Sequence, residues 1–203
     1  MNTGVQRIRP KHPQGGFSMI ELVVSVGILV VITLVVLVNY AAFGGSVLIG
    51  SLAYDVGLSI RQAQVFGLSV REFGFGSGQF DVGYGVHFDM DSPQDYFIYA
   101  DLDKNYIYNA DDGAQEVFNI GRGFSIKRVC VTTVSSTELC SDTDNINVLD
   151  ITFVRPDPDA YIRVDGDAGT VYQSARVVVG SPQGAEREVT VESTGQISVV
   201  PGS

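Results

Sequence analysis

Oxygen-bearing side chains recur at short intervals between residues 101 and 112. In this twelve-residue frame they occupy positions 1, 3, 5, 9 and 12. A hard cation such as Ca²⁺ binds about six to eight oxygens, and a main-chain carbonyl at position 7 can supply one of them. We therefore predict a calcium-binding loop. Its ligands would be Asp101, Asp103, Asn105, Asn109 and Asp112, together with the carbonyl of Ile107.

The spacing resembles that of an EF-hand-type loop, but two features depart from it. Tyr106 stands where glycine normally permits the sharp turn, and the flanking residues are typical of strands rather than helices. The alternative interpretation is an acidic, solvent-exposed turn that ends at Asp111-Asp112-Gly113. The sequence leaves both interpretations open, and no other cofactor is predicted.

Few other residues suggest catalysis or metal binding. The only histidine after residue 16 is His87, which strand alternation places on a polar, exposed face. Cys130 and Cys140 lie close together and predict a disulfide in an extracytoplasmic domain. The chain-entropy model gives so short a loop roughly 2–3 kcal/mol of stabilisation. We predict that the chain is not an enzyme.

Charge is distributed unevenly along the chain. Arg7, Arg9 and Lys11 precede any acidic residue, and the whole chain has a net charge of −10. Without these three basic residues the net charge becomes −13. Because so acidic a domain repels phosphate groups, nucleic acid is not predicted as a partner.

Residues 17–38 form an apolar stretch in which Glu21 is the only charged residue. At ~1.5 Å per residue, this stretch can cross a hydrocarbon core of ~30 Å. The basic residues before it would stay cytoplasmic, so the rest of the chain would lie outside. A secretory signal has a shorter apolar core and a prompt cleavage site. A plain membrane anchor does not account for Glu21.

The segment Gly15–Leu22, with the sequence GGFSMIEL, resembles the type IV prepilin (class III) signal. That signal has a glycine before a phenylalanine and a glutamate at the fifth position of the mature chain. Ser18 and Met19 stand where threonine and leucine are commoner. The resemblance implies cleavage between Gly16 and Phe17 by prepilin peptidase and N-methylation of Phe17.

The resemblance also implies the partners. They are other pilin or pseudopilin subunits, the inner-membrane assembly platform, and membrane lipid before assembly. Once cleaved, Phe17 carries a cationic amine that can pair with Glu21 of a neighbouring subunit. The pair would offset the desolvation of both charges in a filament core and set the register of the helices.

The hydrophobic pattern divides the whole chain into four segments. We predict a cleaved basic leader at 1–16, a membrane-spanning or filament-core helix at 17–40, an amphipathic continuation at 41–73 and a β-rich head at 74–203. The fold class is α+β, with the long helix packed on an antiparallel β-sandwich-like domain, as in the pilin fold. The expected strands are 80–88, 95–100, 116–120, 124–133, 147–154, 160–164, 175–180, 186–192 and 196–200.

Residues 186–192 show the clearest alternation. Val189 and Val191 should face inward, Glu188 should face solvent, and residues 193–196 should close a hairpin.

Parts of the head also resemble one pilin subgroup. The stretches 83–89, 151–156 and 187–199 are similar to GspH/FimT-type pseudopilins. This resemblance implies a minor subunit of a type IV pilus or a type II secretion pseudopilus. The alternative is a membrane-tethered acidic module, calcium-dependent in binding, that does not polymerise. Glu21 discriminates between the two, because a simple tether does not require it.

Overall fold

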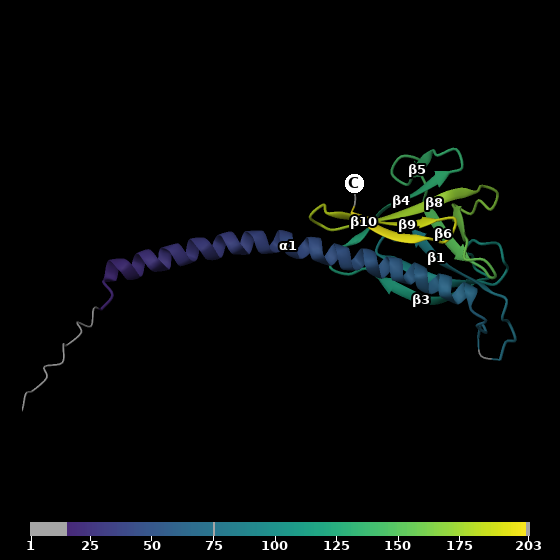
Figure 1. Cartoon of the computed structure of the whole chain (residues 1–203), viewed down its shortest axis with the longest axis horizontal. Coiled ribbons are helices and arrows are strands. Elements are labelled where there is room, and N and C mark those ends of the chain that lie inside the picture. The colour runs from purple at the N-terminus through teal and green to yellow at the C-terminus, as the bar shows by residue number, and fades with distance from the viewer. Residues whose placement is uncertain (1–15, 75, 202–203) are drawn as a thin grey trace, which may run out of the picture. The chain divides into compact units, whose positions relative to one another are not determined.

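The computed structural model describes residues 16–74 and 76–201, apart from the side chains of 38–47 and 201. The chain divides into two compact units, residues 1–41 and 42–203. It is an α+β protein with one long helix, α1 (Met19–Leu68), followed by ten strands in the described part of the chain (Figure 1). The predicted leader falls on residues 1–15, which lie outside the described residues, and on Gly16.

The first unit contains the apolar part of α1. Residues Met19–Leu37 have a mean hydropathy of 2.9, and none of these residues is buried. By length and composition this segment could cross a membrane, and a signal sequence near an N-terminus would pass the same test.

In the second unit, α1 contributes one face to the core. The amphipathic character predicted for this part of the helix is confirmed, because Val56, Ile60 and Ala63 form a fully buried face. The helix ends at Leu68, not at residue 73 as predicted. Close to this end, residues 153–155 pack on the helix: a Cβ at Gly67 would lie 2.2 Å from the carbonyl oxygen of Phe153, and the Arg155 N–H donates to the Gly67 carbonyl at 3.2 Å.

The strands form two antiparallel five-stranded sheets, which we name A and B. The order in sheet A is β3 (Gly113–Asn119), β2 (Asp95–Asp101), β1 (Gly83–Asp89), β6 (Val148–Phe153) and β7 (Ala160–Val164). The order in sheet B is β10 (Ile197–Pro201), β9 (Glu186–Glu192), β8 (Tyr172–Gly180), β4 (Ser125–Thr133) and β5 (Glu138–Cys140).

Both sheets share one hydrophobic core with the C-terminal half of α1. Ser59 reaches sheet A through a hydrogen bond with the Tyr96 hydroxyl (3.1 Å). A Cβ at Gly57 would meet Val199 of β10 at 3.3 Å, so the helix also lies close to sheet B. The predicted inward positions of Val189 and Val191 and the terminal hairpin β9–β10 are confirmed.

Candidate functional site

The N-terminal turn of α1 holds the residues predicted for processing and assembly. The Glu21 N–H donates to Ser18 Oγ at 3.2 Å, so Ser18 caps the helix and Glu21 is in its first turn. Glu21 and Phe17 are exposed. Among the described residues, the Glu21 carboxylate has no hydrogen-bonding or ionic partner.

The Ser18–Glu21 spacing also matches a capping box, in which a glutamate three residues after a serine cap supports the first helical turn. A carboxylate in the first turn is further favoured by the helix dipole. Glu21 therefore has a structural role within its own helix, which is distinct from the predicted pairing with a neighbouring subunit. A test of its charge must leave the start of the helix intact.

The predicted cation ligands meet in the loop between β2 and β3. Asp101 ends β2, and Asp112 immediately precedes β3. Carboxylate oxygens of Asp101, Asp103 and Asp112 lie within 4.8 Å of one another. Asp101 is fully buried, Asp112 is half-buried and Asp103 is exposed. This juxtaposition brings carboxylates from both ends of the loop to one point.

Main-chain and side-chain amides of the same loop bind these carboxylates. Asp101 accepts the N–H groups of Asn105 (3.2 Å) and Tyr106 (3.1 Å). Asp112 accepts those of Leu102 (2.8 Å) and Asn109 (2.9 Å). The loop is therefore closed by hydrogen bonds from its own backbone.

The other predicted ligands belong to the same network. Asp103 accepts the side-chain amides of Asn105 (2.7 Å) and Asn109 (2.9 Å). Ile107 joins through its N–H, which donates to Asn105 Oδ1 at 2.8 Å. The calcium site stays a prediction, because an acidic turn held by its own amides has the same contacts.

Tyr106 occupies the glycine position of the frame without preventing the turn. Its φ is 66°, a left-handed conformation that costs a non-glycine residue about 1–2 kcal/mol. The Tyr106 ring stacks on Tyr161 of β7, with centroids 4.1 Å apart and planes 5° apart. Its carbonyl accepts the Thr152 hydroxyl at 3.2 Å. These contacts hold the loop against the outer face of sheet A.

The pKa values of the buried carboxylates follow from this packing. Burial raises the pKa of Asp101 to about 6, and the Tyr106 N–H opposes the shift. The nearby Asp112 carboxylate raises it further. Burial also raises the pKa of Asp112, against the hydrogen bonds from Leu102 and Asn109. A cation at this point would compete with protons for Asp101.

The prediction that His87 is exposed is wrong, because the residue is buried. Its side chain lies beneath the β2–β3 loop, and the residue is only 9% exposed. His87 Nδ1 is 2.8 Å from Asp150 Oδ1, directly across the β1–β6 pair. Its ring packs against Phe97 (4.8 Å) and Tyr108 (4.9 Å).

Asp150 is the residue of this site that the sequence prediction missed. It is fully buried, and burial raises its pKa, whereas the hydrogen bond from His87 lowers it. One sequence signal could have identified Asp150: it is an acid within a mostly apolar strand, and it lies on the same face as Thr152. His87 and Asp150 therefore form a buried polar contact under the loop.

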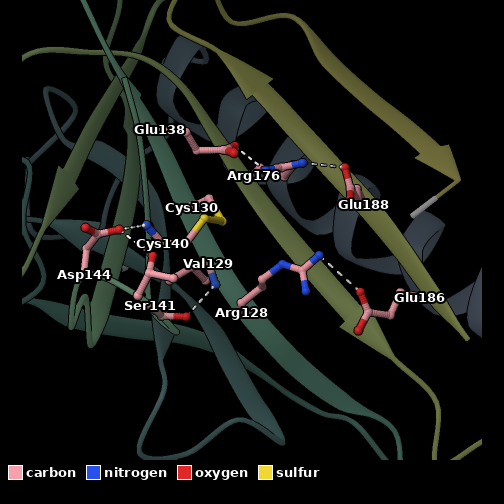
Figure 2. The surroundings of a disulfide bond; sticks show 11 residues. Arg128, Val129, Cys130, Glu138, Cys140, Ser141, Asp144, Arg176, Glu186 and Glu188 are labelled. Carbon is pink, nitrogen blue, oxygen red and sulfur yellow. Dashed lines mark hydrogen bonds and ion pairs between the residues drawn. A yellow bond between two sulfur atoms is a disulfide. The ribbon is translucent and has the colours of Figure 1, made fainter. Parts of the chain in front are cut away.

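The predicted disulfide is confirmed. Cys130 of β4 and Cys140 of β5 are directly opposite each other and bonded (Figure 2). Their sulfur atoms are therefore not free to bind a metal ion. Figure 2 also shows Arg176 between two carboxylates: it pairs with Glu138 of β5 and with Glu188 Oε2 at 3.0 Å. Glu188 is buried by this pairing, so the prediction that it faces solvent is wrong.

Comparisons with known proteins identify no relative of the chain: no family model, curated protein or solved structure matches it.

Proposed function

We propose that this chain is a structural subunit of a type IV pilus or type II secretion pseudopilus, of the minor pilin or pseudopilin kind. In this proposal, cleavage between Gly16 and Phe17 leaves the helix in the inner membrane and the head outside the cytoplasm. The subunit then enters a filament through its N-terminal helix. The chain acts as an assembly component, and the prediction that it is not an enzyme stays a prediction.

One observation carries the proposal. An apolar helical segment, Met19–Leu37, has no protein cover, and a single carboxylate is exposed at its start. Lipid can cover the apolar surface, but the carboxylate is unfavourable for an isolated chain there, because a lone carboxylate costs up to about 2.5–3.5 kcal/mol at the bilayer centre on insertion scales. A neighbouring helix with a cationic amine at Phe17 would cover the apolar surface and pair with Glu21.

The second unit supports the proposal in a general way. A disulfide suits an oxidising, extracytoplasmic compartment, and an α+β head on the C-terminal half of the helix suits the arrangement expected for a pilin. The head is also acidic, which favours a protein assembly over a nucleic-acid-binding role.

A second candidate function is a membrane-tethered acidic module that stays monomeric and binds through its calcium loop. The cluster of Asp101, Asp103 and Asp112 favours this candidate. It gives Glu21 no intermolecular role, so the same substitutions discriminate between the two candidates.

The test replaces Glu21 in the producing organism. Glu21→Ala removes the charge and the capping side chain, whereas Glu21→Gln removes the charge and keeps a group able to cap. Ser18→Ala is the matched control, because it weakens the helix start and leaves the charge. We expect both Glu21 variants to enter filaments about tenfold less or worse, since a buried charge without its partner costs about 3–5 kcal/mol.

Incorporation is measured by quantifying the subunit in sheared filaments against the membrane fraction. The mass of the mature N-terminus reports cleavage before Phe17 and methylation. Glu21→Gln that assembles as well as the unsubstituted chain would refute the charge pairing. An intact leader on the membrane-bound unsubstituted chain would refute the whole proposal.

A further inference from the structure

Strand β3 leaves the outer edge of sheet A open beside α1. The Ile120 N–H donates to the Gln94 carbonyl at 2.7 Å. The register then makes Tyr96–Phe118 and Ile98–Glu116 the hydrogen-bonded pairs of β2 and β3. The main-chain N–H and carbonyl of Val117 therefore point away from β2. A seven-residue edge strand with its middle residues exposed can accept another strand.

The opposite edge of the same sheet is closed by its own chain. At β7, the Ala160 N–H donates to the Ser193 carbonyl and the Asp167 N–H to the Val164 carbonyl, each at 2.8 Å. Arg163 folds over the edge and donates to the Ile162 carbonyl at 3.1 Å. Among the described residues of β3, only the Gly113 carbonyl is covered in this way, by the Gln115 side-chain amide at 3.5 Å, and no such group reaches Val117. The contrast singles out β3 as the edge available for pairing.

An apolar cavity lies between this open edge and the helix. Its volume is about 330 Å³. Its apolar walls are Leu52 and Leu58 of α1, with Tyr96, Phe118 and Ile120 from the sheet side. The Tyr96 and Phe118 rings stack with centroids 5.0 Å apart, which gives the cavity a flat aromatic wall. Leu58 is 66% exposed at the rim. The cavity can take one large apolar side chain.

The surroundings of the cavity are acidic. Asp55 lines it and is exposed, and Glu116 projects from β3 on the same side. Glu116 accepts a hydrogen bond from Gln62 at 2.7 Å, and neither acid is in an ion pair within the described part of the chain. Both carboxylates are close enough to raise the pKa of Tyr96, although its burial contributes more. A basic ligand would be attracted here.

We propose that this groove binds an extended segment of another protein, which adds to β3 as a further strand. One large apolar side chain would fill the cavity, and a neighbouring Lys or Arg would lie beside Asp55 and Glu116. In strand addition, main-chain hydrogen bonds supply affinity and a side-chain pocket supplies specificity. The chain offers both elements side by side, in a groove between an edge strand and a helix. This interaction requires neither membrane insertion nor polymerisation.

The probe is a fluorescently labelled peptide of eight residues that alternates lysine with valine and has one central phenylalanine. It is titrated against the full chain in non-ionic detergent micelles, and binding is followed by anisotropy. Two altered peptides serve as controls. In one, N-methyl groups block the main-chain donors along one edge; in the other, glutamate replaces lysine. We expect each to bind at least about tenfold more weakly.

Three protein variants locate the site. Val117→Pro removes an outward N–H without removing a ladder hydrogen bond, and should weaken binding about tenfold. Leu58→Ala should weaken it several-fold, because the rim of the cavity is lost. Val65→Ala is the matched control: Val65 is 55% exposed on the same helix but does not line the cavity, so binding should be unchanged.

Equal binding of the N-methylated and unmodified peptides would overturn strand addition, and this comparison needs no protein variant. Equal effects of Leu58→Ala and Val65→Ala would overturn the role of the cavity. Self-association of the unliganded chain that is lost in Val117→Pro would show that a second copy occupies the edge, which also overturns the proposed partner.

Discussion

At the scale of single residues, Asp101 shows how burial sets the behaviour of the β2–β3 loop. Its carboxylate is fully buried, and two main-chain N–H groups only partly offset the loss of water. The pKa is raised to about 6. An ionised Asp101 therefore opposes folding unless a cation or a proton neutralises it.

The pH dependence of stability follows from the direction of this shift. The folded pKa of about 6 lies above the ordinary value of 3.8, so the stabilising contribution is present at low pH and lost as pH rises through 6. In a chelating buffer, this contribution should lower the melting temperature as pH rises from about 4 to about 6. Asp101→Asn should flatten this change, as thermal melts followed by circular dichroism would reveal. An unchanged slope in Asp101→Asn would contradict the assignment.

His87 and Asp150 illustrate what a single-strand pattern cannot foresee. Alternation correctly predicted that His87 lies on the face opposite to the core residue Val86, and Asp150, for which no prediction was made, lies on the same outer face of sheet A. The prediction of exposure failed because the β2–β3 loop covers that face, with Tyr108 packed against His87. Burial by a distant loop depends on tertiary contacts, which local periodicity does not encode.

At the scale of elements, the β2–β3 loop is the strongest test of the calcium prediction. Calcium that binds only the folded chain raises stability by about 2.7 kcal/mol at one hundred times Kd. We expect millimolar calcium to raise the melting temperature at pH 7, and the effect to shrink as pH falls below 6 because protons occupy Asp101.

Two substitutions calibrate the calcium measurement. Asp103→Asn removes a predicted ligand charge and should abolish most of the stabilisation. Asp111→Asn removes an exposed charge outside the predicted set and should preserve it. A melting temperature unmoved by calcium in the unsubstituted chain would leave the acidic-turn interpretation.

The short strand β5 is held in the sheet mainly by side-chain links. It has only three residues, and the disulfide and the Arg176–Glu138 ion pair connect it to its neighbours. Cys140→Ser should lower the free energy of unfolding by roughly 2–3 kcal/mol in the chain-entropy model. Denaturant titration of this variant, beside the unsubstituted chain with and without reductant, would measure the loss. Equal free energies of unfolding for Cys140→Ser and the oxidised unsubstituted chain would show that the bond adds no stability.

Sequence patterns were most reliable where an element is long and contacts near neighbours. They located α1 and nine strands, including the alternation of Val189 and Val191. They missed β5, because three residues are too few to show a period. They also misplaced Glu188, whose burial depends on Arg176 one strand away. Such pairings across strands are fixed by register, which the local sequence does not specify.

At the scale of the whole molecule, the candidate features occupy separate places. The start of α1 carries Glu21, the β2–β3 loop carries the carboxylate cluster, and the β3 edge carries the open groove. Substitutions in one should therefore leave the others intact, because distant sites without shared partners have nearly additive effects on stability. Calcium stabilisation, peptide binding and filament entry can be measured as independent properties.

The contacts between α1 and the C-terminal hairpin also impose an order on biosynthesis. Gln64 donates to the Gly195 carbonyl at 3.0 Å, and Gly57 lies against Val199. The helix leaves the ribosome before these partners do, so part of its apolar face has no cover until β10 has been synthesised. Pairing of such remote segments is intrinsically slow. A nascent head that lacks β10 would therefore expose apolar surface of α1, and such transiently exposed surface promotes aggregation.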